Sequence, residues 1–298
     1  MFVIKYRKIF FIVTMILTVF SFFALFYFGL NFGIDFRGGS ILEVSYESRP
    51  SIEAVKENLN KLELGDYSIR PSGEKNFILR TKAILPDKKT AVNGALSIGN
   101  SLPKEERFNT IGPVVGKELQ NKALVAIGVV ILGIVLFITF AFRKVSEPVS
   151  SWKYGMATII ALAHDVLVPT GIFIVFSKFH GGEIDMLFVT ALLAILGYSV
   201  HDTIVVFDRV RENLRINRET RKKEEFETTV GRSVAQTFGR SINTSLTIFL
   251  VLVALYFIGG ESTRNFAFVL LVGVIAGTYS SIFLASPLLV TLEKLQKK

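Results

Sequence analysis

The run IFFIVTMILTVFSFFALFYFGL, residues 9–30, decides the fold class of this chain because it is apolar along its length and carries no charge. A helix that crosses a bilayer needs about 20 mostly apolar residues, and this run meets that length. Lys5, Arg7 and Lys8 precede it, as basic residues precede the core of a signal peptide. The run is too long for a typical signal core, however, and no A-x-A cleavage pattern follows it. We therefore interpret it as a retained membrane anchor.

The composition of the whole chain agrees with a membrane protein. Of its 298 residues 50% are hydrophobic and 27 are phenylalanine, which is normal for a multi-span membrane protein. The net charge of +9 is typical of basic cytoplasmic loops, so we expect no nucleic-acid binding. The absence of cysteine excludes disulfides, thiolate metal sites and thiol catalysis. The sequence also lacks a GxxxxGK[ST] phosphate loop, which argues against ATP hydrolysis.

Five further apolar runs predict five further spans, at residues 123–142, 154–176, 184–207, 242–258 and 265–289. The chain is therefore expected to divide into four parts. These are an N-terminus with the first helix (1–30), a polar segment (31–120), a five-helix region (121–290) with a cytoplasmic loop at about 209–240, and a tail (291–298).

Basic residues set the expected orientation of these spans. Arg143, Lys144 and Lys153 lie between spans two and three, and Lys294, Lys297 and Lys298 end the chain. A larger group lies between spans four and five: Arg209, Arg211, Arg215, Arg218, Arg221, Lys222 and Lys223. The positive-inside rule then places both termini in the cytoplasm and the polar segment outside.

The polar segment has the pattern of a small folded domain. Residues 41–46, 67–71 and 76–83 alternate as strands do, and residues 51–62 and 90–98 have helical spacing. The order strand, helix, strand, strand, helix predicts a ferredoxin-like α+β domain. It contains no cluster with metal-ligand spacing and no nucleophile motif, so we expect a binding or lever domain.

The stretch GYSVHDTIVVFDRVREN, residues 197–213, places His201 and Asp202 inside an apolar run. A charged side chain near the bilayer centre costs on the order of 3 kcal/mol, and such residues usually face the bundle interior or a hydrated path. Because desolvation and a nearby cation shift a carboxyl pKa in opposite directions, Asp202 is suited to proton coupling. The alternative is a fixed, hydrogen-bonded structural aspartate.

Other polar residues of the spans have weaker interpretations. His164 and Asp165 form a second ionisable pair at membrane depth, which we expect to be a secondary site. Asp208 and Arg209 are expected to be a solvated pair at the cytoplasmic interface, and residues 218–228 a helical cytoplasmic loop. Gly273, Gly277 and Ser281 form a small-residue stripe that favours helix packing, within the chain or against a partner.

Several motifs stand in the order found in the SecF family of bacterial protein-export membrane proteins, which the sequence resembles over nearly its whole length. They are GIDFRGGS (33–40), IGPVVGKEL (111–119), ALAHDVLVPTG (161–171), GYSVHDTIVVFDRVREN, GRSINTSLT (239–247) and GVIAGTYSSIFLASPLL (273–289). The most specific are those of spans four and five. Many family members have Asn where this chain has His201, so a role of that Asn does not transfer.

The resemblance implies a six-span bundle, half of one like that of resistance–nodulation–division exporters, with SecD supplying the other half. It implies that the chain works with the SecYEG translocon, YajC, YidC and a translocating preprotein in the bacterial cytoplasmic (inner) membrane. It also implies that protons drive this work, without a cofactor. It pairs Asp202 with Arg240, although from the residues alone anchoring of a cytoplasmic helix end is the favoured explanation of Arg240. His201 is either a proton-relay candidate or a hydrogen-bond partner of a neighbouring helix, and Asn243 is a candidate hydrogen-bond partner near Asp202. In the GIDFRGGS motif, Asp35, Gly38 and Gly39 fit either an interface or an ordinary turn.

Two rival functions remain compatible with the sequence. The chain could be half of an exporter for small molecules or lipids, although its outside domain is small for that purpose. It could also be a purely structural stabiliser of the translocon. An enzyme is not expected, because no second carboxylate, Ser/Lys pair or metal-ligand pattern accompanies Asp202.

Overall fold

The structure is a computed structural model that describes residues 2–62, 64, 65, 67–82, 84, 86–99, 101–143 and 149–296. The chain divides into two compact units. A helical bundle contains the residues up to Asn31, 125–182 and those from Leu187, and an α+β domain contains 32–124 and 183–186. Lys144, Lys297 and Lys298, which support the expected orientation, and Ala83, the last residue of an expected strand, lie outside the described residues.

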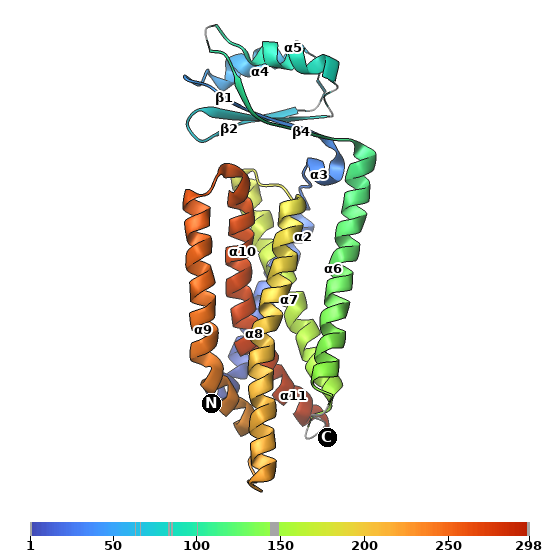
Figure 1. Cartoon of the computed structure of the whole chain (residues 1–298), viewed down its shortest axis with the longest axis vertical. Coiled ribbons are helices and arrows are strands. Elements are labelled where there is room, and N and C mark those ends of the chain that lie inside the picture. Colours follow the sequence, from blue (N-terminus) through green and yellow to red (C-terminus); the bar gives the residue numbers. More distant parts are fainter. Residues whose placement is uncertain are drawn as a thin grey trace. The chain divides into compact units, whose positions relative to one another are not determined.

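The α+β domain is a four-stranded antiparallel sheet with two helices on one face (Figure 1). Its elements are α3 (Ile34–Arg37), β1 (Gly39–Ser45), α4 (Ile52–Asn60), β2 (Tyr67–Ser72), β3 (Asn76–Thr81), α5 (Pro86–Leu96) and β4 (Lys104–Ile111). The strand order β2-β3-β1-β4 and the β-α-β-β-α-β connection confirm the predicted ferredoxin-like domain.

Strand alternation builds the core of this domain. Leu42 on β1 lies opposite Leu79 on β3, and both side chains are fully buried on the helix-covered face. Helix α4 begins at Ser51, whose hydroxyl accepts a hydrogen bond from the Ala54 N–H at 3.3 Å. The apolar face of α4 and the buried side of α5 complete the core, which includes Val55, Leu59, Val92 and Leu96. These contacts explain why the alternating and helical patterns were readable in the sequence.

The sequence pattern did not predict β4. Its residues KEERFNTI are mostly charged or polar, and nearly all of them are exposed. It forms one edge of the sheet and pairs with β1, whose apolar side chains fill the core. A polar edge strand lacks the apolar alternation by which a half-buried strand is recognised.

Among the described residues, six helices are long and apolar enough to span a membrane, which confirms the predicted six spans. Five are α2 (Arg7–Phe28), α6 (Pro113–Ala141), α7 (Ser151–His180), α8 (Met186–Glu219) and α9 (Phe226–Ile258). The sixth, Thr263–Leu295, consists of α10 (Glu261–Tyr279), a π-helical turn η1 (Ser280–Ala285) and α11 (Ser286–Gln296). A short helix, α1 (Phe2–Lys5), precedes α2.

The range 209–240, expected as a loop, is helical except at residues 220–225, because α8 and α9 both extend beyond their apolar parts. The expected helix over residues 218–228 is also replaced by this break. Ion pairs between neighbouring turns support the polar end of α8, for example Arg209 with Glu212 at 2.5 Å and Arg211 with Asp208. Such pairs stabilise helices that leave the apolar environment.

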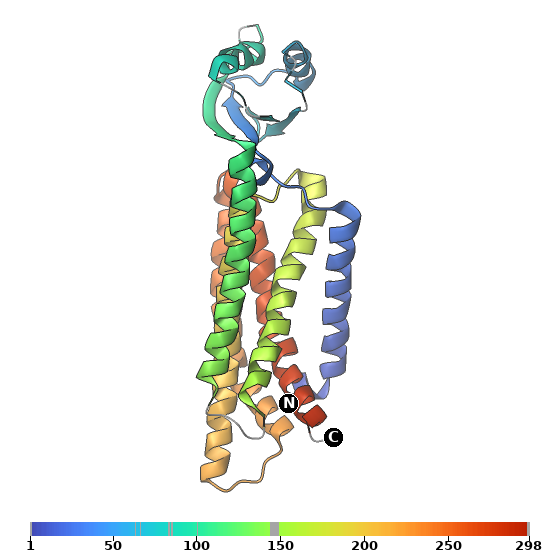
Figure 2. The same ribbon diagram turned by 90° about the vertical axis from the view of Figure 1, so that its right-hand side faces the viewer.

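Small residues allow the closest helix contacts in the bundle. A Cβ atom on Gly171 of α7 would lie 2.5 Å from the Cα atom of Ser21, where α2 lies beside α7 (Figure 2). A Cβ atom on Gly277 of α10 would lie 3.0 Å from that of Ser199 on α8, and one on Gly273 would overlap Ile195. The small-residue stripe of α10 is therefore a packing face within the chain.

Candidate functional site

Asp202 lies on α8 inside the bundle, with 8% of its surface exposed. Its Oδ1 atom accepts a hydrogen bond from the hydroxyl of Ser241 on α9 at 2.5 Å. Its Oδ2 atom is buried and has no hydrogen-bond partner among the described residues. One oxygen of the carboxyl group is thus hydrogen-bonded, and the other has no partner among the described residues.

A hydroxyl cluster supports Ser241 from three helices. Ser245, one turn further along α9, donates to the Ser241 carbonyl at 2.7 Å and accepts from the Tyr198 hydroxyl of α8 at 2.6 Å. The Ser245 hydroxyl also lies 2.6 Å from that of Thr278 on α10. We use the name hydroxyl cluster for Tyr198, Ser241, Ser245 and Thr278; it orients the donor that contacts Asp202.

The structure does not bring Arg240 into contact with Asp202. Arg240 is exposed, and within the described part of the chain Asp202 forms no ion pair. Successive residues of a helix differ by about 100° in direction, so the inward turn of Ser241 leaves Arg240 pointing away. His201 is exposed for the same reason, next to the inward-facing Asp202. Arg232, another basic residue of α9, pairs with Glu224 at 2.7 Å.

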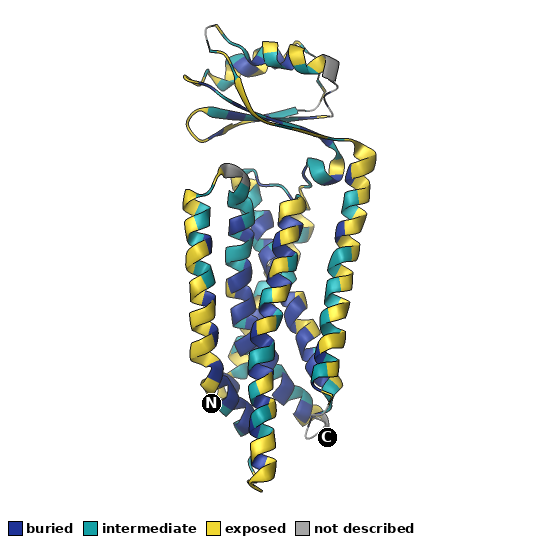
Figure 3. Cartoon of the chain, viewed as in Figure 1, coloured by how far each residue is buried: buried dark blue, intermediate teal, exposed yellow. Residues whose placement is uncertain are grey.

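The exposed side of α9 carries polar side chains among apolar ones such as Leu246 and Leu250. Arg240, Asn243, Thr244 and Thr247 are all exposed, and Asn243 does not reach Asp202 as the sequence suggested. The exposed side chains of α2 are apolar instead, as lipid-facing side chains are: among them Ile12, Met15, Ile16, Val19, Phe23 and Phe26. Figure 3 shows α9 with much of its length exposed. Polar residues seldom face lipid, so the polar part of the exposed α9 side suits a protein or hydrated neighbour.

His164 and Asp165 lie together on α7 and are almost completely buried, with exposed fractions of 2% and 0%. The Nδ1 atom of His164 lies 2.9 Å from the Oδ1 atom of Asp165. Asp165 also accepts hydrogen bonds from Ser199 of α8 and Ser280 of η1. The sequence identified the pair but not these serines, because serine is too common in helices to signal a contact.

The GIDFRGGS motif forms a turn inside the α+β domain. Gly38 and Gly39 have φ angles of +77° and +135°, which side chains rarely allow. A Cβ atom on Gly38 would lie 2.6 Å from the Cα atom of Pro113, in the IGPVVGKEL motif. Asp35 accepts a hydrogen bond from the Met186 N–H, the first residue of α8, at 2.9 Å. The motif therefore ties the domain to the segment that begins α8.

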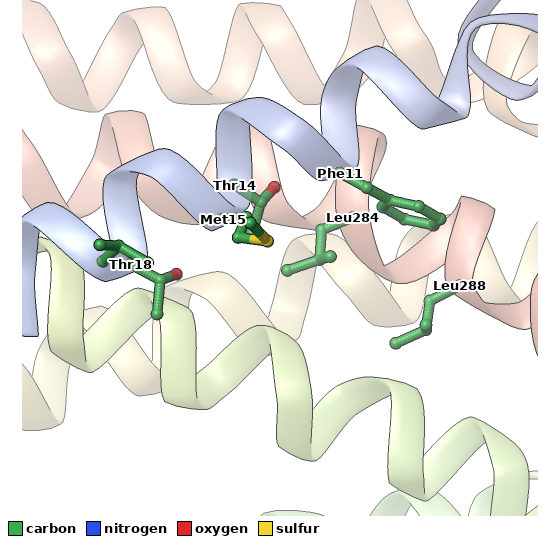
Figure 4. Close-up of a pocket in the computed structure, with 7 residues that line it drawn as sticks. Phe11, Thr14, Met15, Thr18, Leu284 and Leu288 are labelled. Carbon is green, nitrogen blue, oxygen red and sulfur yellow. The ribbon is translucent and has the colours of Figure 1, made fainter.

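Other parts of the described chain lack a metal-binding cluster of side chains, and a groove beside α2 lacks titratable side chains. They contain no group of three His, Asp or Glu residues able to hold a metal ion. A groove of about 260 Å³ beside α2 is lined by Phe11, Thr14, Met15, Thr18, Val19, Leu284 and Leu288 (Figure 4). The Thr14 hydroxyl donates to the Phe10 carbonyl, and the lining contains no titratable side chain. The groove therefore does not compete with Asp202 as a proton-binding site.

Six spans, a carboxyl site between helices and a small α+β domain after the first span define a multi-span membrane protein of the transport type. The model of the protein-export membrane protein SecD/SecF, C-terminal, matches residues 96–295, and that of the SecD/SecF GG motif matches residues 23–48. The chain belongs to this family, as a SecF-type protein-export membrane subunit.

Individual relatives agree with this assignment. The chain is 41% identical to the protein translocase subunit SecF of Thermobaculum terrenum, covering 98% of this chain and 93% of the relative. It is 38% identical to that of Anaerolinea thermophila, covering 96% and 92%.

A solved structure shares the fold. The crystal structure of SecDF, a translocon-associated membrane protein from Thermus thermophilus, matches with a TM-score of 0.83 and 30% identity. The match covers 98% of this chain and 38% of the SecDF chain. A structure of SecDF in a super-membrane-facing form matches with a TM-score of 0.68, over 99% and 38%.

Proposed function

We propose that this chain works with a SecD-type partner in the bacterial cytoplasmic membrane and uses the proton motive force to assist protein export. The proposed step is late and extracytoplasmic, as a preprotein emerges from SecYEG, and the coupling ion is the proton, without a cofactor. Both chain termini would lie in the cytoplasm. The observation that carries the proposal is the half-satisfied carboxyl group of Asp202.

The surroundings of Asp202 suit reversible proton binding. The Ser241 hydroxyl favours the ionised carboxylate, whereas burial and the unpartnered Oδ2 atom favour the protonated acid. Because these two influences oppose each other, a small movement or an entering water molecule can change whether the carboxyl group is protonated. Arg240, next to Ser241, could supply a cation by turning α9 or its own side chain. His201 could pass protons between the site and a neighbouring subunit.

The polar face of α9 supports a partner subunit at this place. A SecD-type bundle packed there would cover Arg240 and Asn243 and border the proton path beside Asp202. The Bacillus subtilis relative is a single SecDF subunit, of which this chain matches 36% at 34% identity. YajC and YidC are further members of the assembly that the family resemblance implies.

The start of α8 offers a route from the site to the α+β domain. Residues 183–186 lead directly into α8 and belong to that domain. There Ile184 pairs with Phe32, and the Arg80 guanidinium lies 3.2 Å from Glu183. A shift of α8 caused by protonation of Asp202 would therefore pull on the domain through the chain itself. One charge crossing the membrane yields about 2.3 kcal/mol per 100 mV, so several protons suffice for a domain movement.

Asp202→Asn tests the proposal in a strain that lacks its own copy of the protein. The amide keeps the size and the Ser241 contact but cannot bind the proton, so proton-driven export should fall to the level of the deletion strain. Asp208→Asn, on the same helix but exposed and paired with Arg211, is the matched control and should leave export unchanged. Wild-type export by Asp202→Asn would instead favour a purely structural subunit.

A further inference from the structure

We propose that Asp165 and His164 form a second proton-binding site in the bundle, distinct from Asp202 and linked to it through α8. The statement that both sites take part in one proton-driven cycle rests on the proposed function. The binding of a proton at this pair rests on its own geometry, which involves α7, α8 and η1.

The carboxylate of Asp165 is the fixed part of this site. Oδ1 accepts from His164, and Oδ2 accepts from Ser199 and from the Ser280 hydroxyl at 2.7 Å. Three donors on a fully buried carboxylate hold it in one position and stabilise its ionised form. Among the described residues the ion-pair partner of Asp165 is His164, at 2.9 Å, so charge that balances the carboxylate comes from the imidazole.

The imidazole of His164 is the variable part. Its Nδ1 atom must carry a hydrogen to bond the ionised carboxylate. Its Nε2 atom is buried and has no hydrogen-bond partner among the described residues. With Nε2 bare, the pair carries a net negative charge in an apolar setting, which is costly. With a proton on Nε2, the pair is neutral but an N–H lacks an acceptor, so neither state is fully satisfied.

The π-helical turn η1 connects this site to the packing of α10 against α8. Ser280, the first residue of η1, bonds Asp165, and Ser281 donates to the Ser199 carbonyl at 3.2 Å. The Ser281 hydroxyl also lies 2.8 Å from that of Thr203. Single π-helical turns are uncommon and often occur at functional sites. A change in the charge of the pair would act directly on the turn that holds α10 against α8.

Helix α8 carries both sites on adjacent stripes. Ser199 and Thr203, four residues apart, face the Asp165 side, while Tyr198 and Asp202, also four residues apart, face the hydroxyl cluster. A rotation or shift of α8 therefore changes both environments together. This arrangement couples the two sites without a direct contact between their carboxyl groups.

Few titratable groups face the pair from the helices around it. Tyr279 lies next to His164, with ring centroids 6.1 Å apart, and its hydroxyl donates to the Phe10 carbonyl of α2. On α8 the titratable residues nearest in sequence to Ser199 are Tyr198, His201 and Asp202. Tyr198 and Asp202 bond toward α9, and His201 is exposed. On α2 the titratable residues lie near the two ends, at Arg7, Lys8 and Tyr27. Within the described residues, Asp165 and His164 are therefore each other's charge partner.

Difference infrared spectroscopy over a pH series tests this site in the full chain, purified with its SecD-type partner in lipid nanodiscs. We expect a protonated-carboxyl or coupled imidazole signal that Asp165→Asn removes and Asp202→Asn retains. His164→Gln should move the midpoint of the remaining Asp165 signal by about one pH unit or more, because it removes the group that shares the proton. A spectrum unchanged by Asp165→Asn at every pH would overturn the proposal.

Two further variants keep the test decisive if Asp165→Asn does not fold. Ser280→Ala retains the Asp165 carboxyl group but removes one of its hydrogen-bond donors. The midpoint of the Asp165 signal should therefore move toward higher pH, whereas a merely structural role of Ser280 predicts no movement. Thr170→Val is the control on the same helix, because the Thr170 hydroxyl donates to the Val166 carbonyl of its own helix. Equal midpoints for Ser280→Ala and Thr170→Val would refute the site. Normal export by Asp202→Asn, in contrast, would remove the proposed function and leave titration at Asp165 standing.

Discussion

Asp202 and Asp165 are both buried in the bundle, yet their carboxyl groups have different hydrogen-bond partners. Asp202 has one hydroxyl donor and an open oxygen, whereas Asp165 has two hydroxyl donors and an imidazole. The first can respond to a small change in its neighbourhood, and the second can respond only if the imidazole or η1 changes with it. Single hydrogen bonds therefore decide which carboxyl group is the more easily switched.

The sequence predicted the depth of these residues but not their partners. Asp202 stands inside an apolar run, so its burial follows from hydropathy alone. In contrast, Arg240, Ser241 and Asn243 occupy a single turn of α9, and all three are polar. Hydropathy does not say which of them turns inward; packing against α8 and α10 selects Ser241.

Glu183 gives a prediction about pH and stability in the α+β domain. Burial raises the pKa of Glu183 above its ordinary value of 4.5, against the opposing effects of Arg80 and Arg70. The Arg80 contact at 3.2 Å lacks hydrogen-bond geometry, which explains why burial prevails. The folded protein thus holds this proton more tightly than the unfolded chain. Stability from this group is present below pH 4.5 and is lost as pH rises through the raised pKa.

Glu183→Gln should remove that loss. The stability of the variant relative to wild type should increase as the pH rises from about 4 and then level off above the raised pKa. Thermal unfolding of both proteins at a series of pH values measures this difference. A difference that is constant with pH would show that Glu183 has an ordinary pKa.

Helices and strands were predictable wherever their burial is one-sided or complete. The six spans and the strands β1, β2 and β3 follow from apolar runs and from alternation. The strand β4 and the polar ends of α8 and α9 do not, because tertiary pairing and ion pairs support them instead. The widening of the last span into η1 also has no hydropathy signal, since it depends on side-chain contacts to α7 and α8.

The crossing of α2 and α7 is expected to depend on Gly171. Alanine there would place a methyl group 2.5 Å from the backbone of Ser21, so α2 must move away. We expect Gly171→Ala to lower the free energy of unfolding by about 1–3 kcal/mol, as overpacking does. Unfolding of the purified protein in mild detergent measures the effect.

Gly133→Ala is the matched control for this prediction. Gly133 lies in another span, α6, and has no atom within 4 Å of the added Cβ position. Its substitution should change stability by less than about 0.5 kcal/mol. An equal loss at both positions would mean that the detergent, rather than the α2–α7 contact, sets the result, because alanine favours a helix more than glycine does.

At the scale of the whole molecule, the two sides of the bundle differ in the side chains that they expose. The exposed side chains in the apolar run of α2 are apolar, whereas α9 exposes Arg240 and Asn243 as well as apolar side chains such as Leu246 and Leu250. The polar part of the α9 side suits contact with a protein partner. The Asp202 site then lies next to the surface that a partner would cover.

The absence of native cysteine allows a direct test of this surface. Asn243→Cys, labelled with a benzophenone maleimide in membranes, should photo-cross-link to a SecD-type subunit. Met15→Cys on α2, which is 66% exposed, should react with lipid and give no such product. Cross-linking from Met15 but not from Asn243 would place the partner on the opposite face.

The central claim is that Asp202 takes up and releases the protons that drive this protein. Proton entry into vesicles that contain the purified complex, under an imposed membrane potential and pH gradient, tests it most directly. We predict that Asp202→Asn reduces proton entry to the level of empty vesicles, while Asp208→Asn matches wild type. Proton entry through Asp202→Asn at the wild-type rate would contradict the account.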